Sequence, residues 1–360
     1  MSRGVAVVVA LVSLLLGALA APAAGAQQPA PAAPPPPRAW VLVDADTGAV
    51  LDGGRHREAM LVASVFKILT ALVTIENLPL DADVPISARA EGMPARRMQL
   101  KNGEVWKASD LLHALLLASA NDAAVALAER TAGSLEAFGG MLDRTAERLH
   151  LADAPVLKDP AGLDDEFSVD GGSRISARDL AIAARAFLAY EELVSITRLP
   201  EYRFTGGDNE PHRLRSHNRL LTMYPGALGL KTGYTKRAGH TLIGAAERDG
   251  RRMVAVVLGA ADPYGSVIRL LDRGFATPVS AQADLDHLPP VALGDALEPV
   301  TGEAPAPRPV STPVAVAAGS RAPSVPTDLL VLLAGSAPAV AILIRRRKTS
   351  RTAATTAWPI

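Results

Sequence analysis

Residues 229–259 read GLKTGYTKRAGHTLIGAAERDGRRMVAVVLG, and three runs within them have the composition of β-strands. The runs are residues 229–235, 240–246 and 252–259, which are mostly apolar or β-branched and are joined by short connections. Residues 247–250, Glu-Arg-Asp-Gly, are typical of a hairpin turn. Because hairpins join neighbouring antiparallel strands, this segment predicts one antiparallel sheet.

Two further strands are predicted near the start of the folded region. Residues 40–44, Trp-Val-Leu-Val-Asp, have strand character, and Asp46-Thr47-Gly48 indicates a turn into residues 49–51. We expect these early strands to join the late ones in a single sheet, with helices packed on its faces.

Between the early and late strands the chain is predicted to be helical. Long apolar segments without strict alternation favour buried helices over strands. The expected helices cover residues 64–75, 110–130, 135–149 and 176–188. Ser176 and Asp179 have the spacing of a capping box at the start of the last one. The fold class is therefore α+β, with a helical insertion between the two portions of an antiparallel sheet.

Composition excludes several kinds of function. Lys and Arg number 37 and Asp and Glu number 37, so the balance of charge gives no reason to expect nucleic acid as a partner. Cysteine is absent, which excludes disulfides, thiolate metal sites and cysteine nucleophiles. The seven histidines are scattered and form no His-Glu-x-x-His string, so we predict no metal and no cofactor.

The N-terminal residues are expected to be a targeting segment. Arg3 precedes the apolar residues 5–19, and Ala24-Gly25-Ala26 has the small-x-small pattern of a cleavage site, so residues 1–26 are predicted to be a signal peptide. The alternative is an uncleaved membrane anchor. Residues 27–37 are rich in proline and are expected to form an extended spacer.

The C-terminal third changes character twice. We expect the main folded domain over residues 38–277, a short extension over 278–303 and a Pro/Ala-rich linker over 304–327. Residues 328–344 are almost wholly apolar and are predicted to be a transmembrane anchor, followed by a basic cytoplasmic tail over 345–360. The folded domain would then lie outside the cell membrane. A cell-wall sorting signal is the alternative, although Val325-Pro326-Thr327-Asp328 matches its motif only loosely.

Three short strings, widely spaced, predict an acyl-transfer site. Ser64 and Lys67 lie about one helical turn apart, so a neutral Lys67 could take the Ser64 proton. Burial beside another cation, for which Lys231 is the candidate, would lower the pKa of Lys67. Ser119 could relay a proton to the leaving group, and the Asn121 amide could accept from a lysine and donate to a substrate carbonyl.

The third string, Lys231-Thr232-Gly233, predicts recognition of a carboxylate. It offers a cation and a hydroxyl, and Gly233 leaves room for a substrate backbone. Each string alone is better explained by an ordinary cap, a solvated lysine or a helix break than by catalysis. Their combination and order favour catalysis.

The chain resembles the serine D-alanyl-D-alanine carboxypeptidases, the low-molecular-mass penicillin-binding proteins, over residues 38–277. Besides the three motifs, residues 159–163 (Asp-Pro-Ala-Gly-Leu) and 229–239 are similar to segments of that family. The resemblance implies peptidoglycan stem peptides as substrates and β-lactams as covalent inhibitors. It also implies an oxyanion hole made by the backbone amides of Ser64 and Tyr234.

This sequence departs from the family pattern in places. Phe66 replaces a small or hydroxyl residue within the first motif and is expected to reshape one wall of the site. His217 stands where some relatives have another polar residue, and its role is open. No second β-rich domain is evident beyond residue 277.

Two other functions use the same residues. A serine β-lactamase would need a base to activate water against the acyl-enzyme, and Glu166 lies after the second motif. A non-enzymatic sensor of β-lactams or cell wall would keep the cleft without turnover. The intact Ser64, Lys67 and Lys231 favour the carboxypeptidase over the sensor.

Overall fold

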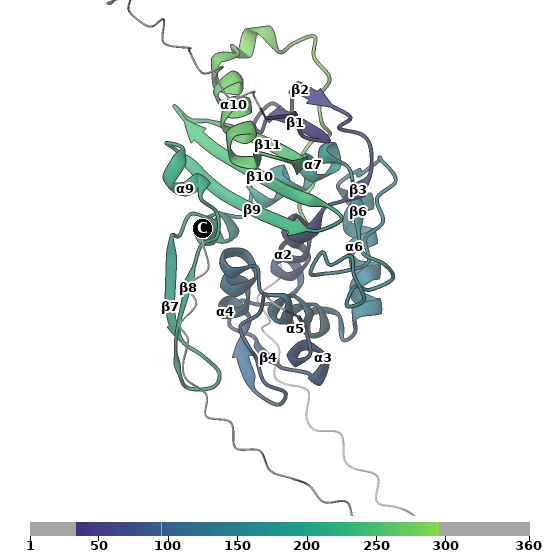
Figure 1. The fold of residues 1–360 in the computed structure, drawn as a ribbon, viewed down its shortest axis with the longest axis vertical. Helices are drawn as coiled ribbons and strands as arrows, with labels where there is room; N and C mark the ends of the chain where they lie inside the picture. The colour runs from purple at the N-terminus through teal and green to yellow at the C-terminus, as the bar shows by residue number, and fades with distance from the viewer. Residues whose placement is uncertain (1–33, 95, 295–360) are drawn as a thin grey trace, which may run out of the picture. The chain divides into compact units, whose positions relative to one another are not determined.

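A central antiparallel sheet organises the protein (Figure 1). The computed structural model describes residues 34–94 and 96–294. Five strands form the sheet in the order β2-β1-β11-β10-β9. They are β1 (Ala39–Asp44), β2 (Val50–Gly54), β9 (Ala227–Thr235), β10 (Gly239–Arg248) and β11 (Arg251–Ala260). Strand β1 pairs with β11, so the prediction that early and late strands share one sheet is confirmed.

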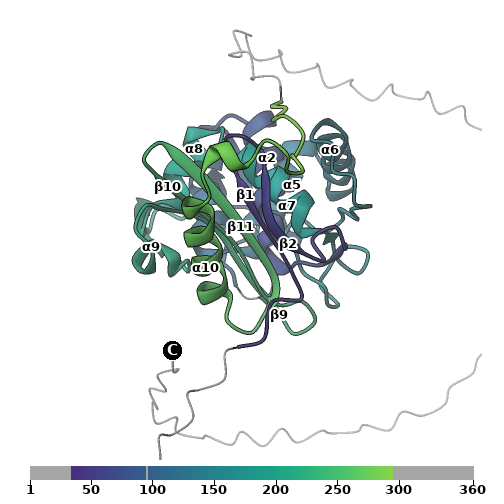
Figure 2. The ribbon, with the colours of Figure 1, turned by 90° about the horizontal axis from the view of Figure 1, so that it is seen from above.

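Both faces of this sheet are buried by helices. Alternate side chains of each strand point to opposite faces and so join two different cores. Leu42 packs with helix α10 (Pro263–Ala276) on one face, whereas its neighbours Val41 and Val43 join the larger core on the other. Helix α7 (Ala177–Phe187) covers that second face (Figure 2). Two layers of helices therefore enclose the sheet, as expected for strands that are apolar on both sides.

The remaining helices make up the insertion. They are α2 (Lys67–Asn77), α3 (Ala88–Glu91), α4 (Ala108–His113), α5 (Asn121–Ala132), α6 (Leu135–Arg148), α8 (Glu191–Thr197) and α9 (Leu220–Met223). Short 3₁₀ turns form η1 (Ala63–Phe66) and η3 (Val279–Ala281), and η2 (Ala114–Ala118) is a π-helical turn. Helix α2 is buried almost all round, its polar residues Lys67, Thr70, Thr74 and Glu76 included, because it runs through the core in contact with the sheet, α5 and α7.

The predicted cap of α7 is confirmed in one half only. Ser176 Oγ accepts a hydrogen bond from the Asp179 N–H at 2.9 Å, as an N-cap should. The Asp179 carboxylate does not complete the box; it accepts from the backbone N–H groups of Ala152 and Asp153 instead. Burial is the main cause of its raised pKa, about 6.

The prediction of an all-helical middle is wrong in detail. Three short strand pairs lie there: β3 (Met60–Leu61) with β6 (Arg174–Ile175), β4 (Asp83–Pro85) with β5 (Val105–Lys107), and β7 (Glu201–Thr205) with β8 (Pro211–Arg215). The β7–β8 hairpin is rich in charge and lacks an apolar run. It is stabilised by packing of rings from other elements, such as Tyr202 stacked on His113 at 3.7 Å between centroids.

Residues 277–294, which follow α10, run from the edge of the sheet to helix α2. Their backbone bonds the edge of the sheet, where the Val50 N–H donates to Asp286 O and the Leu288 N–H donates to Gly48 O, both at 2.8 Å. At the last described residue, the Gly294 N–H donates to the Glu76 carboxylate. Over residues 278–294, the predicted extension thus contacts both the edge of the sheet and helix α2.

Several predicted segments lie outside the described residues: the signal peptide, most of the spacer, the linker, the anchor and the basic tail. Among the residues that are described, no helix is long and apolar enough to cross a membrane.

Candidate active site

The first motif lies at a junction between the sheet and the helices. Ser64 is on the 3₁₀ turn η1, and Lys67 begins α2 directly after it. The Thr241 hydroxyl of β10 donates to Val62 O at 2.8 Å, which ties the turn to the sheet. Ser64 is half-buried, whereas Lys67 is completely buried.

Three groups surround the Lys67 amine. Nζ lies 3.0 Å from Ser64 Oγ, 2.8 Å from Asn121 Oδ1 and 2.6 Å from Ala161 O. A neutral amine has two N–H donors and one lone pair. The two carbonyl oxygens can only accept, so they take both N–H groups and leave the lone pair for the Ser64 hydroxyl. The geometry is that of a base beside its nucleophile.

Electrostatics favour the same protonation state. Burial is the main cause that lowers the pKa of Lys67 to about 7, and the charge of Arg96 lowers it further. The carboxylates of Asp159 and Asp122 act in the opposite direction. Near neutral pH a large share of Lys67 is therefore unprotonated, as a general base requires.

The second motif follows a distorted turn. After the π-helical turn η2, Ser119 adopts a left-handed backbone with φ of 59°, and α5 begins at Asn121. Such a conformation is strained for a residue with a side chain, and π turns of this kind often lie at functional sites. The turn directs the Asn121 amide to Lys67, while its Nδ2 donates to Pro94 O at 3.2 Å.

Ser119 itself is buried next to Asn121. Within the described residues its hydroxyl makes no hydrogen bond to Lys67 or Lys231, so the relay stays a prediction.

The loop after α6 supplies a partner that the sequence reasoning missed. The buried Asp159 carboxylate accepts from the N–H groups of Ala161 and Leu163, each at 2.9 Å, and so fixes the loop. Thr70 on α2 donates to Pro160 O at 2.7 Å. Together these bonds place Ala161 O on the Lys67 amine. In the sequence, residues 159–163 stand out only by their similarity to a family segment, and nothing in that string indicates that the Ala161 carbonyl contacts the Lys67 amine.

The turn before the nucleophile is tightly packed. Ala63 has φ of 53°, an uncommon value for a residue other than glycine. Gly162 lies against it with φ of +72°, and a Cβ there would come within 2.2 Å of Ala63 O. The first motif and the Asp159 loop therefore lock each other in place.

The third motif lies on β9, the edge strand beside the nucleophile. A Cβ on Gly233 would meet the backbone nitrogens of Ser64 and Val65 at 2.9 and 3.0 Å, so only glycine allows this approach. Lys231 is buried and donates to Thr232 O at 2.9 Å. Burial lowers its pKa well below the usual value, and the nearby Lys67 and Arg96 add to the effect. Tyr234 is exposed.

The structure thus brings together the predicted site residues of three separate elements. Ser64, Lys67 and Asn121 are in contact, and β9 with Lys231, Thr232, Gly233 and Tyr234 lies against the same turn.

Two other expectations about the site are decided by burial. Phe66 is completely buried in the core, so it does not form an open wall of the site as predicted. Glu166 is exposed, whereas its neighbour Asp164 is buried and accepts from Thr235 Oγ1 at 2.7 Å. The acidic loop is therefore held to the end of β9 through Asp164, and Glu166 is exposed and makes no hydrogen bond to Ser64 or Lys67 among the described residues.

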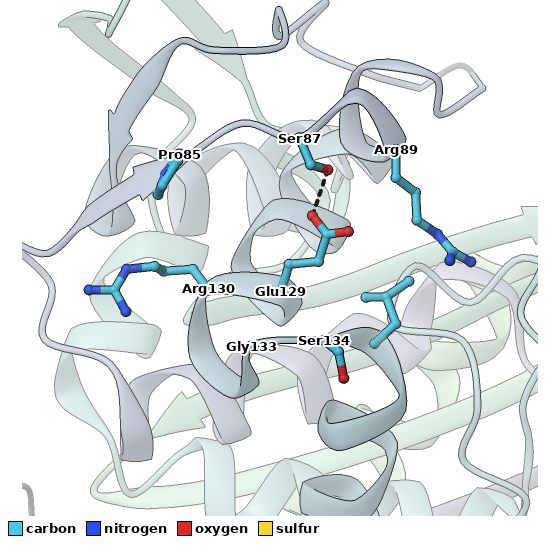
Figure 3. Close-up of a pocket in the computed structure, with 8 residues that line it drawn as sticks. Pro85, Ser87, Arg89, Glu129, Arg130, Gly133 and Ser134 are labelled. Carbon is cyan, nitrogen blue, oxygen red and sulfur yellow. Dashed lines mark hydrogen bonds between the residues drawn. The ribbon is translucent and has the colours of Figure 1, made fainter. Parts of the chain in front are cut away.

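A hollow of about 600 Å³ lies elsewhere, where α3, α5 and α6 meet (Figure 3). Its lining includes Arg89, Arg130 and Glu129, and Ser87 donates to the Glu129 carboxylate at 2.6 Å. It shares no residue with the cluster around Lys67. Its Ser87–Glu129 pair belongs to the cap of α3, because Ser87 Oγ also accepts from the Ala90 N–H at 3.0 Å. The Lys67 cluster instead pairs a buried amine with the Ser64 hydroxyl, so we take that cluster as the candidate site. Within the described part of the chain, no group of His, Asp and Glu side chains could hold a metal ion.

Comparisons with known proteins agree with this geometry. Residues 26–262 match the family model described as D-alanyl-D-alanine carboxypeptidase. The D-alanyl-D-alanine carboxypeptidase DacF of Bacillus subtilis is 34% identical over 244 residues, which are 66% of this chain and 61% of the relative. The chain thus spans less than two thirds of that relative's length.

Solved structures show the same similarity. A D-alanyl-D-alanine carboxypeptidase from Mycobacterium tuberculosis H37Rv superposes with a TM-score of 0.64 and 31% identity, covering 72% of this chain and 99% of the other. Penicillin-binding protein D2 from Listeria monocytogenes in its cefotaxime-bound form gives 0.59 and 26%, covering 66% and 97%.

Proposed function

Because this chain belongs to the D-alanyl-D-alanine carboxypeptidase family, we propose that it removes the terminal D-alanine from peptidoglycan stem peptides through an acyl-enzyme on Ser64. The observation that carries the proposal is the Lys67 amine, whose lone pair faces the Ser64 hydroxyl while two carbonyl oxygens take its N–H groups.

Acylation follows from this arrangement. Lys67 takes the Ser64 proton as Oγ attacks the carbonyl carbon of the penultimate D-alanine, and the backbone amides of Ser64 and Tyr234 receive the oxyanion. When the C–N bond breaks, the proton passes from Lys67 to the departing D-alanine amine, with Ser119 as the relay. The products are the ester on Ser64 and free D-alanine.

Deacylation reverses the proton movements. A water molecule gives one proton to Lys67 as it attacks the ester, and Ser64 recovers its proton as the C–O bond breaks. The peptide leaves one residue shorter, with a new terminal carboxylate.

Substrate binding uses the open edge of β9. Strand β9 is the last in the sheet and pairs with β10 on one side, so an extended peptide can pair with its other side. The Asn121 amide, the Thr232 hydroxyl and Lys231 would then hold the peptide backbone and its terminal carboxylate. β-Lactams would acylate Ser64 in the same cleft, as the cefotaxime complex of the Listeria protein supports.

Glu166 gives no support to a β-lactamase, because among the described residues it is exposed and makes no hydrogen bond to Ser64 or Lys67. A sensor that bound the cell wall without being acylated would not need a neutral amine beside Ser64, whereas a sensor acylated by β-lactams would need it, so turnover distinguishes the latter from the carboxypeptidase.

The site is proposed to work on the cell-wall side of the membrane. The support is in the sequence alone: the apolar residues 5–19, and the apolar residues 328–344 with four basic residues directly after them. Fractionation of cells, followed by protease treatment of intact spheroplasts, tests this: an extracytoplasmic domain is digested and a cytoplasmic one is protected.

One experiment tests the activity. The purified full chain is incubated with benzylpenicillin and followed by intact mass, while D-alanine release is measured from a peptide ending in D-alanyl-D-alanine. A long-lived adduct with D-alanine release is expected, and Ser64→Ala should abolish both. Rapid loss of the adduct without D-alanine release would instead show a β-lactamase, and a stable adduct without turnover would show a sensor.

A further inference from the structure

An arginine and a histidine pair at the rim of the site, and the mechanism above uses neither. Arg96 precedes β5, and His217 lies between β8 and α9. Arg96 Nη1 is 2.8 Å from His217 Nδ1, and both residues are exposed. Their contact joins segments 121 residues apart in the chain.

The backbone of Arg96 is anchored to the second motif. Arg96 O accepts from the Asn121 N–H at 2.8 Å. The next turn of this loop is held by the buried Asp122 carboxylate, which accepts from the N–H groups of Met98 and Gln99 at 3.1 and 3.0 Å. The guanidinium therefore projects from a loop whose position is fixed by the residues that also place the Asn121 amide.

His217 is fixed from the other side. Its N–H donates to Leu117 O at 3.1 Å, and its carbonyl accepts from the Tyr264 hydroxyl at 3.2 Å. Because a guanidinium has only donors, Nδ1 must be the acceptor, and the ring is neutral with its proton on Nε2. The surroundings agree: partial burial of the ring, then the charges of Arg96 and Lys231, lower the pKa of His217 to about 4.

Arg96 differs from the two lysines of the site in its exposure. Lys67 and Lys231 are buried and their pKa values are lowered, so their positive charge is disfavoured in the free protein. Arg96 is exposed, and its charge acts on both lysines. A guanidinium keeps its charge and can hold a carboxylate with two parallel hydrogen bonds.

We propose that Arg96 recognises the terminal carboxylate of the peptide substrate, and that His217 is a positioning residue that orients the guanidinium toward it. This inference rests on the proposed carboxypeptidase function. Arg96, which lies in the helical insertion, would thus act on the carboxylate together with Lys231 and Thr232 of β9.

The test uses the full chain and two thioester substrates: an N-acyl-D-alanyl thioglycolate and the same compound with its carboxylate converted to a primary amide. Arg96→Ala is expected to lower kcat/KM for the acid about 10- to 100-fold, mainly through KM, and to change it about twofold or less for the amide. Arg97→Ala is the matched control, because Arg97 is the exposed neighbour that donates to Met93 O. It should leave both substrates unaffected.

A second pair of variants tests the positioning role. His217→Ala should lower the preference for the acid over the amide, and His217→Asn should restore it, because its amide oxygen can accept where Nδ1 does. Equal losses on acid and amide in Arg96→Ala would show a structural role and overturn the proposal, as would no loss at all. An unchanged preference in His217→Ala would overturn the role of His217.

The same assay separates the two levels of inference. If the wild-type protein turns over neither thioester, the proposed function itself fails and this inference fails with it. If the wild type is active and loses its activity in Ser64→Ala, but Arg96→Ala behaves as Arg97→Ala does, only the recognition role is overturned.

Discussion

The start of helix α2 and strand β9 each bury a lysine, Lys67 and Lys231, but the two amines have different hydrogen-bond partners. Lys67 contacts Ser64, Asn121 and Ala161, which come from three separate parts of the chain. Lys231 bonds only the carbonyl of the next residue, Thr232, among the described residues. Burial lowers the pKa of both, but their partners differ, which suits Lys67 to its proposed role as base and Lys231 to its proposed role in binding a ligand.

The largest effect on acylation should come from replacing each lysine, one at a time, by methionine, an apolar residue of similar length. Lys67→Met is expected to slow acylation of Ser64 by about 10²–10⁴-fold, because the base is lost. Lys231→Met should act mainly on substrate binding. Labelling with a fluorescent penicillin at several concentrations separates rate from affinity. Equal effects on the acylation rate in both variants would remove the distinction between the two regions.

The pH dependence of acylation should follow the Lys67 amine. Since burial lowers the pKa of Lys67 to about 7, the neutral form is lost as the pH falls below that value. The acylation rate should drop about tenfold per pH unit there, to about 1% of its plateau at pH 5, and should level off above neutrality. Stopped-flow acylation by a chromogenic β-lactam measures this. A rate that is flat between pH 5 and 7 would contradict the assignment of the base.

The packing around the first motif can be broken without touching either lysine. Gly162→Ala should lower the free energy of unfolding by about 2–4 kcal/mol, because it combines a positive φ with a clash against Ala63 O. Gly139, on α6 with open space around it, is the control, and Gly139→Ala should raise the free energy of unfolding by about 0.5–1 kcal/mol. Urea denaturation compares the two. A neutral Gly162→Ala would show that the Asp159 loop is not locked to the turn.

The smallest expected effect concerns the support of the Ala161 carbonyl. Thr70→Val removes the donor to Pro160 O and should cost about 1–2 kcal/mol of stability, because the buried acceptor is left unpaired. Thr74 is buried one turn later on α2, and its hydroxyl has no hydrogen-bond partner within the described residues. Thr74→Val should therefore be neutral or stabilising. Thermal unfolding of both variants tests this, and equal losses would show that the Thr70 bond contributes nothing.

Local composition was sufficient to predict the late strands of the sheet. Strands β9, β10 and β11 were predicted nearly to their ends, because their residues are mostly apolar or β-branched and the turn at residues 247–250 is typical. The β7–β8 hairpin was missed because its strands are charged and pack against the rings of His113 and Trp106 from other elements, which local composition does not show.

The site also contains residues that the sequence reveals and residues that it does not. Its motifs reveal Ser64, Lys67, Asn121 and Lys231, because the residue type fixes the chemistry of a side chain. They do not reveal Ala161, because its functional atom is a backbone carbonyl that every residue possesses. Arg96 is not recognisable from the sequence either, because a single exposed arginine has no motif around it and its proposed role depends on its contact with His217.

The sequence by itself determined the strands of the central sheet and the family, and it supplied the proposed nucleophile and base, because these depend on local pattern and on the kinds of side chain present. Only the tertiary structure decided that Lys67 has two carbonyl acceptors, that Phe66 lies in the core and that Glu166 faces solvent. The physical reason is that pKa values, hydrogen-bond partners and burial depend on atoms brought together from distant parts of the chain, and local sequence does not specify those distances.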